Sequence, residues 1–159
     1  MEEKRIIHVV AAVIKKNDLI LATQRGYGEF KGMWEFPGGK IEEGENLEEA
    51  LVREINEELD TIVDVEKYLC TVNYDYPNFH LIMDTFICSL KDDKLNMVYH
   101  NDNELEHEDY KWLTIKNIEE VNWLPADIEI VNELKKISTI SRWYFYFLFL
   151  EFIFSSFNL

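Results

Sequence analysis

The chain has 159 residues, of which 47% are hydrophobic, and its formal net charge at pH 7 is −15. This length and apolar content predict one domain with a sizeable core and argue against intrinsic disorder. The acidic balance, without a stretch rich in lysine and arginine, argues against a nucleic-acid polymer as a partner. Anionic small molecules remain compatible with such a chain if metal ions screen its carboxylates.

The start of the chain and its two cysteines bear on the cellular location of the protein. The first residues carry charges but no long apolar segment followed by small residues, so we expect no signal peptide and a cytoplasmic protein. Cys70 and Cys88 lack the spacing of metal ligands, and each falls in a strand-like run. We interpret both as buried free thiols.

The first elements are strands. Residues 6–14 are rich in β-branched and small apolar side chains, and residues 19–23 follow after a polar break, which predicts a β-hairpin. Arg25 ends the second strand. The glycines of the following loop indicate flexibility, because the loop lacks the lysine and hydroxyl residue of a phosphate-binding loop.

A tight turn is predicted at residues 36–39. Pro37 fixes its own φ, whereas Gly38 and Gly39 tolerate positive φ and let a bare backbone approach a ligand closely. The carbonyl oxygen of Gly38 is therefore a candidate ligand for a metal ion.

The segment after this turn, residues 47–59, has the periodicity of an amphipathic helix. Glu54, Glu57 and Glu58 stand at i, i+3 and i+4, so their side chains converge on one patch beside the apolar stripe. Partly desolvated carboxylates repel one another, and Mg²⁺ or Mn²⁺ would relieve this repulsion. Arg53 is next in angle and can brace a carboxylate. A bare run of glutamates would instead be interpreted as a solvated acidic helix.

The middle of the chain predicts a second hairpin. Residues 62–76 and 80–90 are strand-like and are separated by a Pro-Asn pair, so the sheet is expected to be mixed. Residues 91–109 are polar and acidic and predict a loop over the site. A short strand is expected at residues 110–113.

The chain ends in a predicted helix and an unusual tail. Residues 126–137 have helical spacing, and Asp127 in the first turn can cap the helix or complement its dipole. From residue 143 to 154 only Glu151 is charged, yet a spanning helix needs about 20 apolar residues. A helix packed on the domain, an oligomer contact, an interfacial anchor and an end without function remain alternatives. We favour packing or self-association over a membrane.

The turn and the glutamate helix together resemble the Nudix box, and the flanking WEFPGGKIEEGE resembles the MutT-type nucleotide pyrophosphohydrolases. The residues at the spacing of the box are Gly39, Glu45, Arg53, Glu54, Ile55, Glu57 and Glu58. Asp60 replaces the glycine of the box, and Thr61 replaces its apolar residue. Both follow the metal patch, so we interpret them as an altered helix exit, at a cost of about 1 kcal/mol for a left-handed aspartate.

The resemblance covers roughly residues 6–137 and implies an α/β fold, the Nudix αβα sandwich, with a mixed β-sheet between helices. It divides the chain into a domain at residues 1–137 and a tail at residues 138–159. It implies Mg²⁺-dependent hydrolysis of a nucleoside triphosphate, such as 8-oxo-dGTP, to the monophosphate and pyrophosphate. The implied metal ligands are Gly38, Glu54, Glu57, Glu58 and Glu106.

The resemblance also distributes roles over the remaining site residues. Glu106 or Glu54 would act as general base on a bound water, with Glu57 in the catalytic set and Arg53 orienting the glutamates. By sequence alone, Glu106 would be a solvated loop residue, and His107 receives no role. The implied substrate-binding residues are Arg25 and Lys40 for phosphates, with Glu35, Gly38, Phe36, Phe79 and Asp127.

The base is the open question. In MutT-type enzymes the residue after the Pro-Ala step contacts the base edge, and asparagine serves the reader of oxidised guanine. Asp127 stands there instead, and an ionised carboxylate is an acceptor that suits an exocyclic amino group. Phe36 and Phe79 can stack on a base or belong to the core. A CTP-like pyrimidine substrate and a nucleotide-binding sensor without turnover remain alternatives, although the intact glutamates argue against the sensor.

Overall fold

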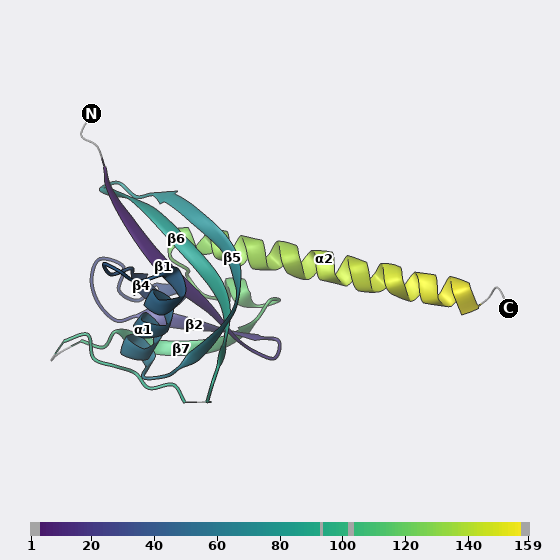
Figure 1. Ribbon diagram of the computed structural model, residues 1–159, viewed down its shortest axis with the longest axis horizontal. Coiled ribbons are helices and arrows are strands. Elements are labelled where there is room, and N and C mark those ends of the chain that lie inside the picture. Colours follow the sequence, from purple (N-terminus) through teal and green to yellow (C-terminus); the bar gives the residue numbers. More distant parts are fainter. Residues whose placement is uncertain (1–3, 93, 102–103, 157–159) are drawn as a thin grey trace.

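The computed structural model describes residues 4–92, 94–101 and 104–156, with side-chain surroundings up to residue 141. In these residues a mixed sheet of seven strands lies between two α-helices (Figure 1). The elements are β1 (Arg5–Lys16), β2 (Leu19–Arg25), β3 (Trp34–Glu35), β4 (Gly38–Lys40), α1 (Leu47–Leu59), β5 (Val63–Asp75), β6 (Phe79–Leu90), β7 (His107–Thr114), a 3-10 turn η1 (Ile118–Glu120) and α2 (Pro125–Ser156).

The sheet is built around β1. The main path runs in the order β3-β2-β1-β6-β5, with β4 paired to β1 and β7 paired to β2. The pair β1–β6 is parallel and the other pairs are antiparallel, so the predicted mixed sheet is confirmed. Both predicted hairpins are present as β1–β2 and β5–β6.

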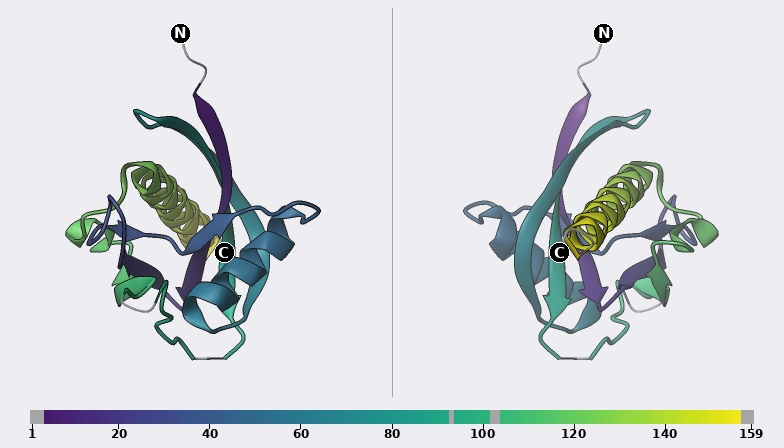
Figure 2. Two further views of the ribbon diagram at one scale, coloured as in Figure 1. Left: turned by 90° about the vertical axis from the view of Figure 1, so that its left-hand side faces the viewer. Right: turned by 90° about the vertical axis from the view of Figure 1, so that its right-hand side faces the viewer.

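The sheet buries both of its faces, which explains why β1 reads as a continuous apolar run. Val10, Ala12 and Ile14 pack on the side of α1, whereas Ala11 and Val13 belong to the second core cluster, which includes α2. Figure 2 shows α1 and α2 on opposite sides of the strands. The predicted αβα sandwich is therefore confirmed.

Helix α1 forms where the sequence predicts it. Asn46 caps its first turn in a reciprocal capping box with Glu49. Leu51 and Ile55 are fully buried, as the apolar stripe requires. Asp60 ends the helix in the left-handed conformation, with φ 45°, which is the altered helix exit expected from the departure at this position.

Three local expectations need correction. The short strand predicted at residues 110–113 already begins at His107, because β7 pairs with β2 as far back as Arg25. The turn at residues 36–39 contributes a strand, β4, to the sheet. Cys88 is buried and free as predicted, but Cys70 is only partly buried.

The predicted end of the second helix at Ile137 is wrong. Helix α2 runs without interruption to Ser156, because no glycine or proline follows Pro125 to stop it. Among its side chains described up to residue 141, the last buried one is Leu134, and beyond it the helix leaves the domain as a rod (Figure 1). Residues 138–156 are thus not a separate helix packed back on the domain, and residues 157–159 lie outside the described residues. Across the described part of the chain, no helix combines the length and hydropathy needed to cross a membrane.

Candidate active site

One pocket of about 800 Å³ gathers the residues singled out by sequence. It extends from the acidic side of α1 and β4, past Arg25, to an aromatic end beside the first turn of α2. Its wall includes each predicted catalytic, metal-binding and substrate-binding residue: Arg25, Glu35, Phe36, Gly38, Lys40, Arg53, Glu54, Glu57, Glu58, Phe79, Glu106 and Asp127. Their individual roles remain predictions.

The glycine turn brings backbone against the carboxylates of α1. The Gly38 amide donates to Oε2 of Glu58 at 3.1 Å. A Cβ atom at Gly39 would lie 2.4 Å from Oε2 of Glu54, closer than any side chain tolerates. The bare backbone of these glycines therefore lies directly against the carboxylates of Glu58 and Glu54, which are themselves candidate metal ligands.

Arg53 braces the glutamates, as predicted. Its guanidinium donates to both carboxylate oxygens of Glu45, at 2.6 and 2.9 Å, and from Nη1 to Glu54 at 2.9 Å and Glu57 at 3.2 Å. It also donates to the carbonyl oxygen of Lys40 at 2.9 Å. The hydrogen bond from Arg53 lowers the pKa of Glu45 to about 2, so this pair stays ionised over a wide pH range.

The carboxylates themselves are poorly solvated. Burial raises the pKa of Glu54 and of Glu58, and neighbouring carboxylates add to both shifts. Among the described residues, no three of these side chains are already arranged to hold a metal ion. Arg53 binds Glu54 and Glu57, and His100 binds Glu106. The candidate metal ligands are oxygen atoms that have limited contact with water. Hard oxygen ligands of this kind fit Mg²⁺ or Mn²⁺.

Glu106 lies at the site and not in a free loop. It directly precedes β7, and its Oε2 atom lies 2.7 Å from Nδ1 of His100. The His100 ring stacks on Tyr27 with centroids 3.5 Å apart, and Arg25 lies over the Tyr27 ring at 4.5 Å. These contacts join the loops after β2 and before β7 across one side of the pocket.

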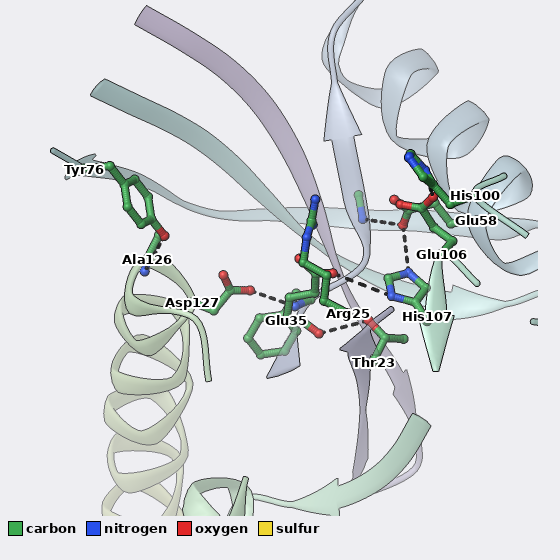
Figure 3. Close-up of polar contacts among 12 residues, drawn as sticks. Thr23, Arg25, Glu35, Glu58, Tyr76, His100, Glu106, His107, Ala126 and Asp127 are labelled. Carbon is green, nitrogen blue, oxygen red and sulfur yellow. Dashed lines mark hydrogen bonds and ion pairs between the residues drawn. The ribbon is translucent and has the colours of Figure 1, made fainter. Parts of the chain in front are cut away.

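His107 is a site residue to which sequence analysis assigned no role. It is 1% exposed and lies between two carboxylates, with Nε2 3.2 Å from Glu58 and Nδ1 3.6 Å from Glu35 (Figure 3). Burial alone would lower the pKa of His107, but the hydrogen bond to Glu58 and the nearby carboxylates raise it. No local pattern identifies this residue, because only the pairing of β7 with β2 brings it into the site.

The aromatic end of the pocket holds Asp127. This side chain is 4% exposed, and its Oδ1 atom accepts the backbone N–H of Phe36 at 2.7 Å. Burial raises the pKa of Asp127 well above its usual value, so the structure disfavours the ionised form assumed from sequence. This hydrogen bond connects the first turn of α2 to Phe36 in the pocket wall.

Two aromatic pairs surround this end. Phe36 is 4% exposed and stacks on Trp123 with centroids 4.5 Å apart, so most of its ring belongs to the core. Phe79 stacks on Tyr76 at 4.7 Å, and the Tyr76 hydroxyl accepts the amide of Ala126 at 3.4 Å. Tyr76 lines the pocket and was not predicted as a site residue.

The fold and the site define an α/β enzyme with a carboxylate helix at a glycine turn and an apolar, aromatic subsite at the other end of one pocket. The model of the NUDIX domain family matches residues 4–148. The chain belongs to this family and is a Nudix pyrophosphohydrolase, as predicted from the sequence.

Curated relatives point in the same direction. The chain is 38% identical over 89 residues to the "8-oxo-dGTP diphosphatase" of Proteus vulgaris, which covers 55% of this chain and 80% of that protein. It is 43% identical over 68 residues to the "CTP pyrophosphohydrolase" of Escherichia coli (strain K12), which covers 42% of this chain and 50% of that protein.

Solved structures share the fold. The MutT protein from Methanosarcina mazei Go1 is similar with a TM-score of 0.72 and 25% identity, over 87% of this chain and 99% of that one. The E. coli ORF135 protein is similar with a TM-score of 0.70 and 28% identity, over 85% of this chain and 92% of that one.

Proposed function

We propose that this enzyme hydrolyses an oxidised nucleoside triphosphate, with 8-oxo-dGTP as the first candidate, to the monophosphate and pyrophosphate. Such a reaction removes damaged nucleotides from the pool. The observation that carries the proposal is one pocket with carboxylates at one end and a buried polar group among aromatic rings at the other. Its volume of about 800 Å³ is in the range of small-molecule sites. The relative named 8-oxo-dGTP diphosphatase supports the choice of substrate.

The cofactor in this proposal is Mg²⁺, which Mn²⁺ can replace. Its ligands would be the carboxylates of Glu54, Glu57, Glu58 and Glu106 with the carbonyl oxygen of Gly38. A bound divalent ion supplies charge for the phosphates and lowers the pKa of a bound water. Without it, a chain of net charge −15 would repel a triphosphate.

The protein's own groups complete the reaction. Glu54 or Glu106 accepts a proton from water, whose oxygen forms a bond to phosphorus while the bond to the bridging oxygen breaks and pyrophosphate leaves. Burial raises the pKa of Glu54, which is the direction expected of a group that accepts a proton. Arg53 keeps the glutamates in place. Arg25 and the exposed Lys40 bind phosphate oxygens, Arg25 from its ion pair with Glu35.

A CTP-like pyrimidine nucleotide is the second candidate. It is favoured by the relative named CTP pyrophosphohydrolase. Both candidates use the same catalytic residues, so they differ only in the base subsite. In either case the partner is a free nucleotide, and the cytoplasm is the expected location.

The test is a panel of normal and oxidised nucleoside triphosphates, each incubated with the full-length protein and Mg²⁺ and scored for pyrophosphate release. We expect the highest kcat/KM for an oxidised purine nucleotide. A preference for CTP or its modified forms would select the second candidate. Tight binding without turnover of any member of the panel would refute the enzyme and support a nucleotide sensor.

A further inference from the structure

We propose that His107 is a positioning residue that orients the Glu58 carboxylate toward the metal ion and couples it to Arg25 through Glu35. The proposal rests on the proposed function, because it concerns the same metal site. The supporting feature is a buried line of contacts in which Arg25, Glu35, His107 and Glu58 come from four different elements (Figure 3).

The first step concerns which oxygen of Glu58 is held. Its Oε2 atom faces Nε2 of His107 at 3.2 Å and accepts the Gly38 amide at 3.1 Å. Two contacts from β7 and β4 on one oxygen fix the rotation of the carboxylate. Within the described residues Oε1 has no hydrogen-bond partner, so this oxygen remains available to a cation.

The second step concerns the other face of the imidazole ring. His107 is 1% exposed, and across the described residues its Nδ1 atom is the buried side-chain polar atom without a hydrogen bond. The nearest carboxylate oxygen is Oε1 of Glu35, at 3.6 Å, while Oε2 of Glu35 accepts from Arg25 at 2.9 Å. Leaving a buried nitrogen unpaired is costly, so a small closing movement of Glu35 would be favourable.

These steps define how the line couples the two parts of the site. Phosphate oxygens that bind Arg25 weaken its ion pair with Glu35, and the released Glu35 can close on His107. The imidazole, held from both sides, then fixes Glu58 more firmly. His107 acts through Glu58 in this scheme, and groups that orient metal ligands typically change metal affinity or activity by about 10–100-fold when removed.

The experiment compares His107→Phe, which removes both ring nitrogens, with His107→Gln, whose amide can still reach Glu58. Mn²⁺ binding to the full-length protein without nucleotide is measured by electron paramagnetic resonance, and kcat and KM are measured across a Mg²⁺ titration. We expect His107→Phe to weaken Mn²⁺ binding by about 10–100-fold and to raise the Mg²⁺ concentration for half-maximal activity. His107→Gln should restore much of both.

Two controls separate positioning from a general loss of structure. His80→Phe changes a histidine outside the pocket, paired with Asp75, and should leave Mn²⁺ binding and activity unchanged. In a Glu58→Gln background, His107→Phe should have no further effect on Mn²⁺ binding, because the two residues act as one unit.

The outcomes are distinguishable. Wild-type Mn²⁺ affinity in His107→Phe, or additive effects of Glu58→Gln and His107→Phe, would overturn the positioning role. If His107→Phe does not fold, His107→Ala replaces it in the Mn²⁺ measurement and in the double-mutant cycle. A wild-type protein that binds Mn²⁺ but turns over no nucleotide would instead refute the proposed function, and the Mn²⁺ measurements would still test His107.

Discussion

The backbone amide of Phe36 donates a 2.7 Å hydrogen bond to Oδ1 of Asp127, which lies 91 residues further along the chain. This bond ties the first turn of α2 to the glycine turn that precedes α1. The side chain that can select a base is therefore anchored to the same segment that supports the carboxylates. Both ends of the pocket depend on one short stretch of backbone.

Replacing this carboxyl by an amide tests the base subsite. Asp127→Asn keeps an oxygen that can accept the Phe36 amide but changes the donors and acceptors offered to a base. We expect the ranking of nucleotides by kcat/KM to change by about 1–3 kcal/mol between favoured and disfavoured bases. The panel of triphosphates measures it. Equal scaling of every substrate would contradict base recognition and favour a purely structural Asp127.

The same substitution makes a prediction about pH and stability. Burial raises the pKa of Asp127 in the folded protein, so between the usual aspartate pKa and this raised value the unfolded chain has lost a proton that the folded chain keeps. The free energy of unfolding of the wild type therefore decreases as pH rises through this range, by about 1.4 kcal/mol for each unit by which the folded pKa exceeds the unfolded one. Asp127→Asn lacks this loss.

Urea unfolding of both proteins from pH 4 to pH 8 measures the effect. The stability of Asp127→Asn relative to the wild type should increase as pH rises, beginning near the usual aspartate pKa of about 4. A difference that is constant over this range, or that decreases with pH, would show that the carboxyl ionises normally in the folded protein.

Glu57 provides the test of the metal mechanism. Its side chain is 57% exposed and its hydrogen bond is to Arg53, so Glu57→Gln should leave the fold intact. A neutral amide cannot match the charge of a metal-binding carboxylate. We expect kcat to fall about 100-fold or more at saturating Mg²⁺.

The matched control is Glu48→Gln, which removes an exposed carboxylate from the first turn of the same helix, outside the pocket. Its activity should equal that of the wild type. A fully active Glu57→Gln enzyme with an unchanged melting temperature would refute the mechanism.

A methyl group at Gly39 should disturb the site more than the fold. The Cβ atom of Gly39→Ala would meet the Glu54 carboxylate at 2.4 Å, and that flexible side chain must move away. We expect lower kcat and weaker Mn²⁺ binding, with a small change in the melting temperature. Gly38→Ala is the contrasting variant, because its Cβ would meet the carbonyl oxygen of Val10 in the sheet and should destabilise the protein. Unaltered kinetics in Gly39→Ala would refute a fixed role for Glu54.

Truncation after Ile137 tests the tail. Among the side chains of α2 that the structure describes, the last buried one is Leu134 and the one that lines the pocket is Asp127, so the shortened protein should keep its specific activity. If the tail mediates self-association, sedimentation should shift toward monomer. Because the end of α2 extends away from the domain (Figure 1), its removal should change thermal stability little. Binding of only the full-length chain to lipid vesicles would support an anchor. Loss of activity in a folded, monodisperse truncated protein would contradict the boundary.

The sequence by itself determined the parts of this protein that depend on local periodicity. Helical geometry alone places Glu54, Glu57 and Glu58 on one patch beside the buried stripe that contains Leu51 and Ile55. A short motif with fixed spacing therefore predicted the family, the glycine turn and the acidic wall of the pocket. The continuous course of α2 was also readable, since the chain after Pro125 has no glycine or proline, but the resemblance to the family led to an end at Ile137.

Only the tertiary structure decided which distant residues meet. Strand pairing between β2 and β7 brings His107 opposite Arg25, and the packing of α2 buries Asp127 against Phe36. Such contacts depend on the register of strands and on the position of a helix over the sheet, neither of which has a local signature. Burial in turn raises the pKa of Asp127, because the carboxylate loses its contact with water, and a sequence without coordinates contains no measure of that loss.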